Sequence, residues 1–151
     1  MLDEHISEVN AESELRRADH LFFVTLKYTR TCDVIKSIIR RLINAYDLAI
    51  IDALYCLKKK KKIKEIPLTP ISRIESLRNS YKKIEMIDFI NFYFLLRFID
   101  KAEYTKREEF KRHVTLTVMQ DDEAIEIDID KIKEYFEKTK EFVDYVREKF
   151  K

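Results

Sequence analysis

The chain contains no glycine, and this absence excludes more classes of function than any other feature of its composition. Phosphate-binding loops need glycine, because only a residue without a Cβ lets the backbone turn tightly and approach the phosphate closely. Walker-type nucleotide sites and dinucleotide-binding fingerprints are therefore excluded. Tight hairpin turns also depend on residues that accept a positive φ, glycine above all, so the composition favours helices over sheet.

Cysteine is scarce as well, with only Cys32 and Cys56 among the 151 residues. Both fall on one predicted helix, and their separation along it is too large for a disulfide between them. The chain starts with a polar, acidic stretch instead of the basic and apolar segments of a secretory signal. Two free thiols without an export signal predict a cytoplasmic protein.

Neither sign of charge dominates, because the chain contains 30 basic and 28 acidic residues, which gives a net charge of +2. Global charge therefore makes no case for nucleic acid, and any such case must come from local patches. The most apolar stretch, residues 84–99, contains three charged residues. It is also short for a membrane span, so it predicts a core helix and no membrane partner. Abundant lysine and glutamate with a single glutamine are typical of proteins from thermophiles.

A long apolar stripe does stand out, on a helix predicted from about Cys32 to Lys62. Apolar residues recur there at spacings of three and four, over about 45 Å at 1.5 Å per residue. Asp33 is the predicted N-cap, and the lysines at the far end meet the negative pole of the helix dipole. The second half is apolar on almost every side and needs cover from other helices or from a second subunit. We therefore predict a homodimer, formed through this half or through the helix at 84–99.

Two carboxylates, Asp47 and Asp52, interrupt the apolar half of this helix. A buried carboxylate without a partner is costly, so both are predicted to pair with arginines such as Arg97. The helix that contains Arg97 is apolar on most faces and is expected to pack beside the central one.

The chain as a whole is predicted to be all-α, a single domain of about five helices over residues 1–151, with a flexible N-terminus at about 1–10. The segment between 104 and 130 fits a helical spacing as well as strand alternation, so a short β-hairpin near 114–129 is the alternative to a helix. The third helix is expected to turn Ile71, Ile74 and Leu77 inward. Helices besides the central one are expected at Ala11 to Tyr28 with Asn10 as cap, from Pro70 with Thr69 as cap, at 86–100, and at Asp130 to Phe150.

Residues 73–81, with the sequence RIESLRNSY, resemble the signature helix of the ribonuclease III family, in particular its small archaeal-type members. In that family two carboxylates four residues apart on one helix hold a divalent metal that activates water against a phosphodiester. Here Glu75 takes the place of the first carboxylate, Asn79 that of the second, and Arg78 that of a glycine. Asparagine is a poorer Mg²⁺ ligand. The resemblance implies a helical RNA-processing protein with a degenerate metal site, in which Glu75 is the candidate catalytic residue.

A second pattern, from Arg107 to His113, resembles the Arg-x(4–6)-His motif of HEPN domains, which are dimeric helical proteins and often metal-independent ribonucleases. In that family the arginine and the histidine face a cleft between subunits. The resemblance implies that His113 transfers protons and that Arg107 stabilises the phosphate. Glu108 departs from the asparagine that commonly follows the arginine. The alternative is a charged helix face with a surface histidine.

No metal site and no cofactor, nucleotide cofactors included, are expected, since the histidines show no ligand spacing and no Cys-x-x-Cys occurs. RNA is the predicted partner, and the densest positive patches are expected to contact its phosphates. Whether the chain is an enzyme stays open, and a non-enzymatic dimeric interaction module with merely solubilising basic segments is the remaining alternative. The predicted RNA contacts are Lys58, Lys59, Lys60, Lys61, Lys62, Arg107, Lys111 and Arg112.

Overall fold

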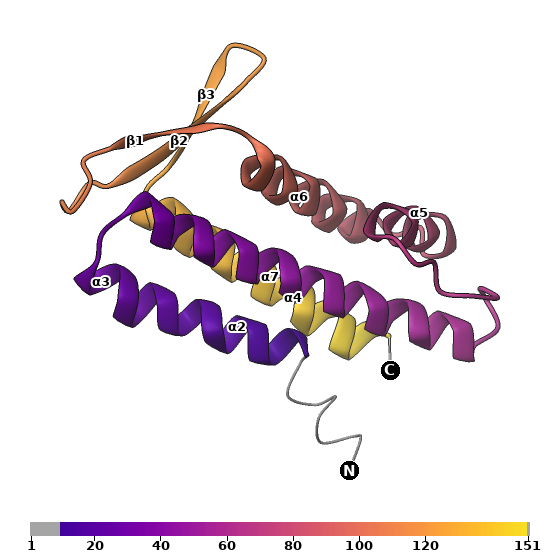
Figure 1. Cartoon of the computed structure of the whole chain (residues 1–151). Coiled ribbons are helices and arrows are strands. Elements are labelled where there is room, and N and C mark those ends of the chain that lie inside the picture. Colours follow the sequence, from indigo (N-terminus) through magenta and orange to yellow (C-terminus); the bar gives the residue numbers. More distant parts are fainter. Residues whose placement is uncertain (1–9, 151) are drawn as a thin grey trace.

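A computed structural model describes residues 10–150 and shows a mostly helical chain with one small antiparallel sheet (Figure 1). Three helical segments follow one another at the start: α2 (Ala11–His20), the π-helical η1 (Leu21–Thr25) and α3 (Leu26–Tyr28). The later elements are α4 (Cys32–Lys59), α5 (Pro70–Ser80), α6 (Ile84–Lys101), β1 (Tyr104–Arg107), β2 (Thr115–Gln120), β3 (Glu123–Ile127) and α7 (Ile129–Lys149). The predicted flexible N-terminus lies outside the described residues, except for Asn10.

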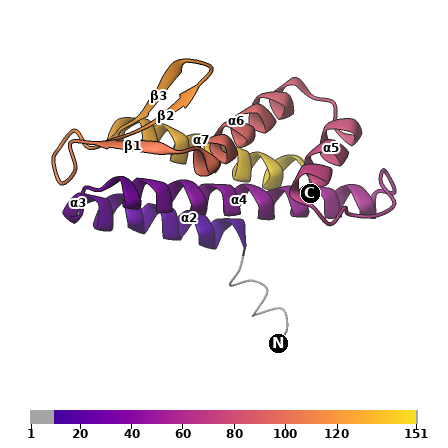
Figure 2. The same cartoon turned by 45° about the horizontal axis from the view of Figure 1, so that its top comes forward.

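The helix α4 is the centre of the fold, as its apolar stripe predicted. It packs against α2 on the side of its N-terminal part, and also against α7, α5 and α6 (Figure 2). Its second half is covered by these helices of the same chain. The apolar surface that motivated a dimer through this half is therefore buried within one chain, while the dimer itself stays a prediction. In the second half of α4, the side chains that are fully or nearly fully buried are Ala49, Ile50, Ala53, Leu54 and Leu57.

The helix α4 begins at Cys32 as predicted, but its cap and its C-terminal end differ from the prediction. Thr31 is the N-cap, with an extended backbone and a side-chain oxygen that accepts a hydrogen bond from the Val34 N–H at 3.3 Å. The prediction of Asp33 as cap was wrong, because Asp33 lies inside the first turn, where its carboxylate accepts a hydrogen bond from the Tyr104 hydroxyl. The helix ends at Lys59, three residues before the predicted end.

The starts of α2 and α5 were predicted correctly, because each is preceded by a residue type that commonly caps a helix. Asn10 caps α2 in a reciprocal pair of hydrogen bonds with Ser13, and Thr69 caps α5 with proline in the first turn. Ile71 was wrongly predicted to face inward, and its side chain is 42% exposed. It lies in the first turn of α5, before the helix comes against α4, so only Ile74 and Leu77 are buried.

The ambiguous segment forms a sheet, with strand order β1-β2-β3 and both pairs antiparallel. The hairpin alternative near 114–129 is thus confirmed as β2 and β3, and β1 was not foreseen. The domain is therefore mostly helical but not purely all-α. A two-residue turn joins β2 to β3, with φ of 50° at Asp121 and 67° at Asp122. The prediction that such turns are unlikely without glycine was wrong here, because aspartate tolerates the left-handed region.

No helix within residues 10–150 combines the length and the apolar character needed to cross a membrane. The stretch at 84–99 instead forms most of α6, a core helix as predicted. Its buried side chains face the other helices of the chain: Met86, Ile90, Phe92, Tyr93, Leu96 and Ile99.

Candidate nucleic-acid interface

Positive charge is concentrated in one continuous segment, residues 58–83, which we call the basic end. It contains ten lysines and arginines but only two glutamates, a net charge of +8. The rest of the chain has the other 20 basic and 26 acidic residues, a net charge of −6, so the total of +2 conceals a strong asymmetry. The segment comprises the C-terminal end of α4, the following loop and α5, away from the sheet at the other end of α4 (Figures 1 and 2).

The lysine run closes α4 through a Schellman-type turn. The Lys62 N–H donates to the Leu57 carbonyl at 2.9 Å, and the Lys61 N–H donates to the Lys58 carbonyl at 3.0 Å. Lys61 occupies the left-handed position of this turn, with φ of 60°, where glycine is the usual residue. The backbone reversal spreads successive lysine side chains around the end of the helix, where the dipole favours positive charge.

These five lysines are all exposed, and within residues 10–150 none of them forms an ion pair. Lys59 alone has a described side-chain contact, since its Nζ lies 5.2 Å from the centroid of the Tyr55 ring. The charges of the run are therefore not neutralised by the described part of the chain. Of the predicted contacts, Lys58 to Lys62 keep the accessibility that phosphate binding requires.

A second basic surface, which we call the arginine groove, lies between α2 and α4. It has a volume of 560 Å³ and contains no acidic residue among its lining side chains: Ser13, Arg16, Arg17, His20, Leu21 and Arg41. Arg16 and His20 are exposed. Bidentate guanidinium donors suit phosphate oxygens, so this groove has the chemistry of an anion site.

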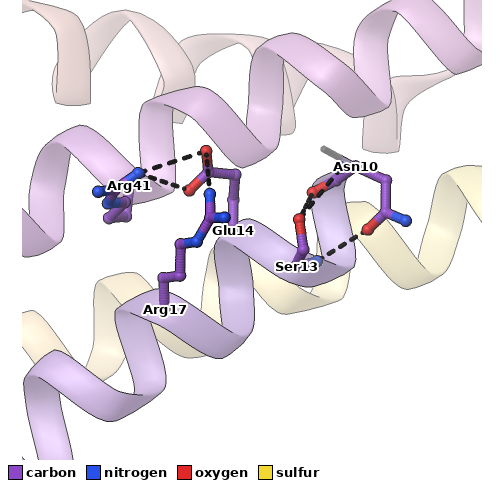
Figure 3. Close-up of polar contacts among 5 residues, drawn as sticks. All are labelled: Asn10, Ser13, Glu14, Arg17 and Arg41. Carbon is purple, nitrogen blue, oxygen red and sulfur yellow. Dashed lines mark hydrogen bonds and ion pairs between the residues drawn. The ribbon is translucent and has the colours of Figure 1, made fainter. Parts of the chain in front are cut away.

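The buried carboxylate of Glu14 holds two of these arginines in place (Figure 3). The Arg41 Nη1 lies 3.2 Å and 3.5 Å from its two oxygens, and the Arg17 Nη1 lies 3.5 Å from one of them. Each guanidinium has five donors, and these contacts engage one nitrogen of each. The remaining N–H groups stay available to a ligand in the groove, while Glu14 limits the side-chain entropy that binding would cost.

The arginine groove was not predicted from the sequence. Its signal consists of Arg16, Arg17 and His20 on one helix and Arg41 on the next. These residues form one surface only once α2 and α4 are known to pack so that Arg17 and Arg41 both reach Glu14 (Figure 3). A spacing rule within a single helix cannot find such a site.

The Arg107 to His113 segment is a strand end and a loop. The alternative of a charged helix face with a surface histidine was therefore wrong about the helix, while His113 is exposed as it expected. Arg107 pairs in register with Thr115, two residues beyond His113. Among the described residues, no hydrogen bond or ion pair joins the Arg107 and His113 side chains. Arg107 instead forms an ion pair with Glu126 on β3 at 3.1 Å, which partly neutralises it.

The same loop is tied to the start of α4. The Glu109 carboxylate accepts a hydrogen bond from the Cys32 N–H at 2.9 Å, and the Phe110 N–H donates to the Arg30 carbonyl at 2.7 Å. Burial, followed by the nearby Glu109 charge, raises the pKa of the Cys32 thiol, which stays protonated. The two hydrogen bonds attach the loop to the residues at the start of α4, which gives the loop a structural role.

The predicted phosphate contacts in this loop are more strongly neutralised by acidic neighbours than the lysine run is. Lys111 lies 3.8 Å from Glu108, with which it forms an ion pair. Arg112 is exposed and, within residues 10–150, has no ion pair. The cluster of Arg107, Lys111 and Arg112 is therefore a weaker positive patch than the basic end.

Glu75 is exposed on α5, at the opposite end of α4 from the loop of Arg107 and His113 (Figure 1). The three predicted catalytic residues therefore do not form one site within a chain. Asn79 and Arg78 are exposed one turn further along α5, and the Arg78 guanidinium lies 5.9 Å from the Phe94 ring centroid. Across residues 10–150, no three histidine, cysteine, aspartate or glutamate side chains are grouped so that they could hold a metal ion.

Comparison of the chain with models of protein families, with curated proteins and with solved structures finds no match. The resemblances to ribonuclease III and HEPN proteins therefore rest on the residues of this chain alone. The structure adds two basic surfaces to them, the basic end and the arginine groove.

Proposed function

We propose that this protein binds RNA through the phosphate backbone, with the basic end as its main contact surface. The observation that supports the proposal best is the net charge of +8 in residues 58–83 against −6 elsewhere. A surface with exposed, unpaired lysines gains affinity for a polyanion by releasing its condensed counterions. The choice of RNA over DNA comes from the resemblance of residues 73–81 and 107–113 to RNA-processing families.

The arginine groove supplies the second contact in this proposal. Arg41 precedes Lys59 by 18 residues on α4, so the two surfaces lie about 27 Å apart along the helix at 1.5 Å per residue. A strand that contacts both must run along the side of the molecule on which α2 packs. The lysines would contribute affinity, and the arginines, held by Glu14, would fix the position of one phosphate.

Binding without cleavage is the form of the proposal that the geometry supports. Arg107 is engaged by Glu126, and Glu75 stands apart from the loop of Arg107 and His113. Cleavage is tested in the same experiment, by incubating single-stranded and structured RNA with and without Mg²⁺. If the HEPN resemblance holds, cleavage persists in EDTA, and His113→Ala removes it while leaving binding intact.

The test of binding compares two triple variants that lose the same charge. One carries Lys58→Gln, Lys60→Gln and Lys62→Gln in the basic end. The other carries Lys133→Gln, Lys140→Gln and Lys149→Gln, which are exposed lysines of α7. Fluorescence anisotropy with a labelled RNA should show at least about tenfold weaker binding for the first variant, because about two phosphate contacts are lost. The control should bind nearly as the wild type does, and equal loss in both would favour the interaction-module alternative.

A further inference from the structure

A pocket of 340 Å³ opens on α4 between the arginine groove and the basic end. Arg41 in the groove and Lys59 in the basic end are 18 residues apart, which is about five full turns at 3.6 residues per turn, so both lie on the same face of α4. On α2, Glu12 lines the pocket and the next residue, Ser13, lines the arginine groove. An RNA strand that joins the two basic surfaces along this face therefore passes the pocket.

The walls of the pocket suit the flat face of a nucleobase. Tyr55 supplies an aromatic ring, and the residue is 54% exposed, so a ligand can reach the ring. The volume lies within the range of small-molecule sites, and exposed aromatic rings stack on bases of every kind. The other apolar residues of the lining come from α2, α4 and α7: Ala11, Ala49, Cys56, Val143 and Val146.

The charge of the pocket separates the base of a nucleotide from its phosphate. The charged residues of the lining are Glu12, Asp52 and Arg147, which have a net charge of −1. The Arg147 guanidinium is engaged by carboxylates, at 2.9 Å from Glu12 and 2.8 Å from Asp144. A phosphate in the pocket would therefore be repelled, whereas an uncharged base would not. The phosphates stay on the lysines and arginines outside, and only the base can enter.

Tyr55 lies directly beside the basic end. It precedes Lys59 by one turn of α4, and the Lys59 Nζ lies 5.2 Å from the centroid of its ring. A phosphate that pairs with Lys59 therefore brings the base of its own nucleotide within reach of the ring. A base inside a duplex is already stacked on both faces, so only an unpaired base can stack on Tyr55.

We propose that the protein binds single-stranded RNA, and that one unpaired base enters this pocket and stacks on Tyr55. This inference rests on the proposed function and specifies the form of RNA that is bound. The basic end and the arginine groove hold phosphates on either side of the base. Phosphate contacts weaken with salt because they release counterions, whereas stacking on Tyr55 does not, so the two contributions can be measured separately.

The experiment compares Tyr55→Leu, which removes the ring, with Tyr55→Phe, which keeps it. Fluorescence anisotropy with a labelled single-stranded RNA should show about tenfold weaker binding for Tyr55→Leu, because one base–aromatic stack is lost. Tyr55→Phe should bind as the wild type does. A duplex of the same length should bind equally to all three proteins. The matched control is Tyr28→Leu, which changes an exposed aromatic residue outside the pocket and should bind both RNAs as the wild type does.

The inference is overturned if Tyr55→Leu binds the single strand as tightly as the wild type does, or if Tyr28→Leu or the duplex shows the same loss. The salt dependence separates this outcome from failure of the proposed function. Tyr55→Leu should weaken binding at every salt concentration and keep the wild-type slope. An effect of the lysine variant without an effect of Tyr55→Leu rejects the base pocket and leaves the RNA surface standing. A wild type that binds no RNA rejects both.

Cys56 reports on the pocket in the wild-type protein. Cys32 is fully buried, while Cys56 is partly exposed and lines the pocket, so iodoacetamide, which is uncharged, should alkylate Cys56 first. Saturating single-stranded RNA should slow this reaction several-fold, and a saturating duplex should slow it less. Mass spectrometry of the alkylated peptides measures both rates. A Cys56 rate that bound single strand leaves unchanged, or a Cys56 that does not react in the free protein, shows that no base enters and rejects the inference.

Discussion

The hydroxyl of Tyr93, on α6, donates a hydrogen bond to the carboxylate of Asp47, on α4. The same oxygen accepts a hydrogen bond from the Arg97 Nη1 at 3.0 Å. Arg97 therefore reaches Asp47 through Tyr93, and the predicted direct pairing of this aspartate with the arginine was wrong. Asp52 was also predicted to pair with an arginine because of the cost of burying it, but it is exposed on α4, so that cost does not arise. The Tyr93–Asp47 pair fixes α6 against the middle of the central helix.

Replacing Tyr93 with phenylalanine should destabilise the protein by about 1–3 kcal/mol at neutral pH, because it removes the donor to a half-buried carboxylate. Burial raises the pKa of Asp47 above its ordinary value, and the Tyr93 hydrogen bond opposes this rise. A raised folded-state pKa means that stability is greatest below the unfolded pKa and is lost as pH rises through the folded one. Without the hydrogen bond the pKa rises further, so the loss should be larger near pH 7 than near pH 4.

Urea denaturation of wild type and Tyr93→Phe at both pH values measures this difference. The control is the pair Asp47→Asn and Asp47→Asn with Tyr93→Phe, in which the titrating group is absent. The difference between these two should not depend on pH over the same window. An equal loss of stability for Tyr93→Phe at both pH values would show that Asp47 is not the group involved.

The helices could be predicted because their signals lie within single segments. The spacing of apolar residues along α4 and α7, and caps such as Thr69, depend only on neighbours in sequence. The turn at Asp121 and Asp122 was not predicted, because aspartate can adopt either a left-handed or a right-handed backbone and its sequence neighbours do not decide between them. The arginine groove required knowledge of which faces of α2 and α4 meet, which periodicity does not supply.

Lys61→Gly should stabilise the protein by about 1 kcal/mol. Lys61 has a φ of 60° at the end of α4, and a residue with a Cβ pays a steric cost in that region that glycine avoids. Thermal or urea denaturation measures the change. The matched control is Lys60→Gly, since Lys60 has a φ of −83° and glycine there only adds freedom to the unfolded chain. Equal effects of the two substitutions would contradict the prediction.

Tyr46→Phe should raise the free energy of unfolding of the protein by about 1 kcal/mol. The substitution removes a buried hydroxyl that has no hydrogen-bond partner within residues 10–150, and the cost of burying such a group disappears with it. The ring stays stacked on Phe142. Tyr46→Ala is the contrasting variant and should cost about 3–5 kcal/mol, because it leaves a cavity in the core. A destabilised Tyr46→Phe variant would mean that the hydroxyl has a partner after all.

The homodimer prediction now depends on the start of α6. Ile84 is 74% exposed and Ile87 is 49% exposed there, one turn apart on the helix. A pair of substitutions, Ile84→Glu with Ile87→Glu, should convert the dimer to monomer, because charges in an apolar contact are costly to desolvate. Light scattering at tens of micromolar protein measures the mass. Tyr28→Glu changes an exposed aromatic residue of α3 and should leave the mass unchanged, and a monomer mass for the wild type would reject the dimer.

The salt dependence of RNA binding distinguishes phosphate contact from other modes of association. For a single strand, the logarithm of the association constant should fall with the logarithm of salt concentration by about 0.7 per phosphate contact. The variant with Lys58→Gln, Lys60→Gln and Lys62→Gln should lose about two contacts, which flattens the slope by about 1.4. Its thermal midpoint should barely move, because these lysines are exposed and form no ion pair with the described part of the chain. Anisotropy titrations at four or more salt concentrations, about 50 to 300 mM, give the slope. An unchanged slope would remove the basic end from the interface, since no other term in the binding energy depends on salt so steeply.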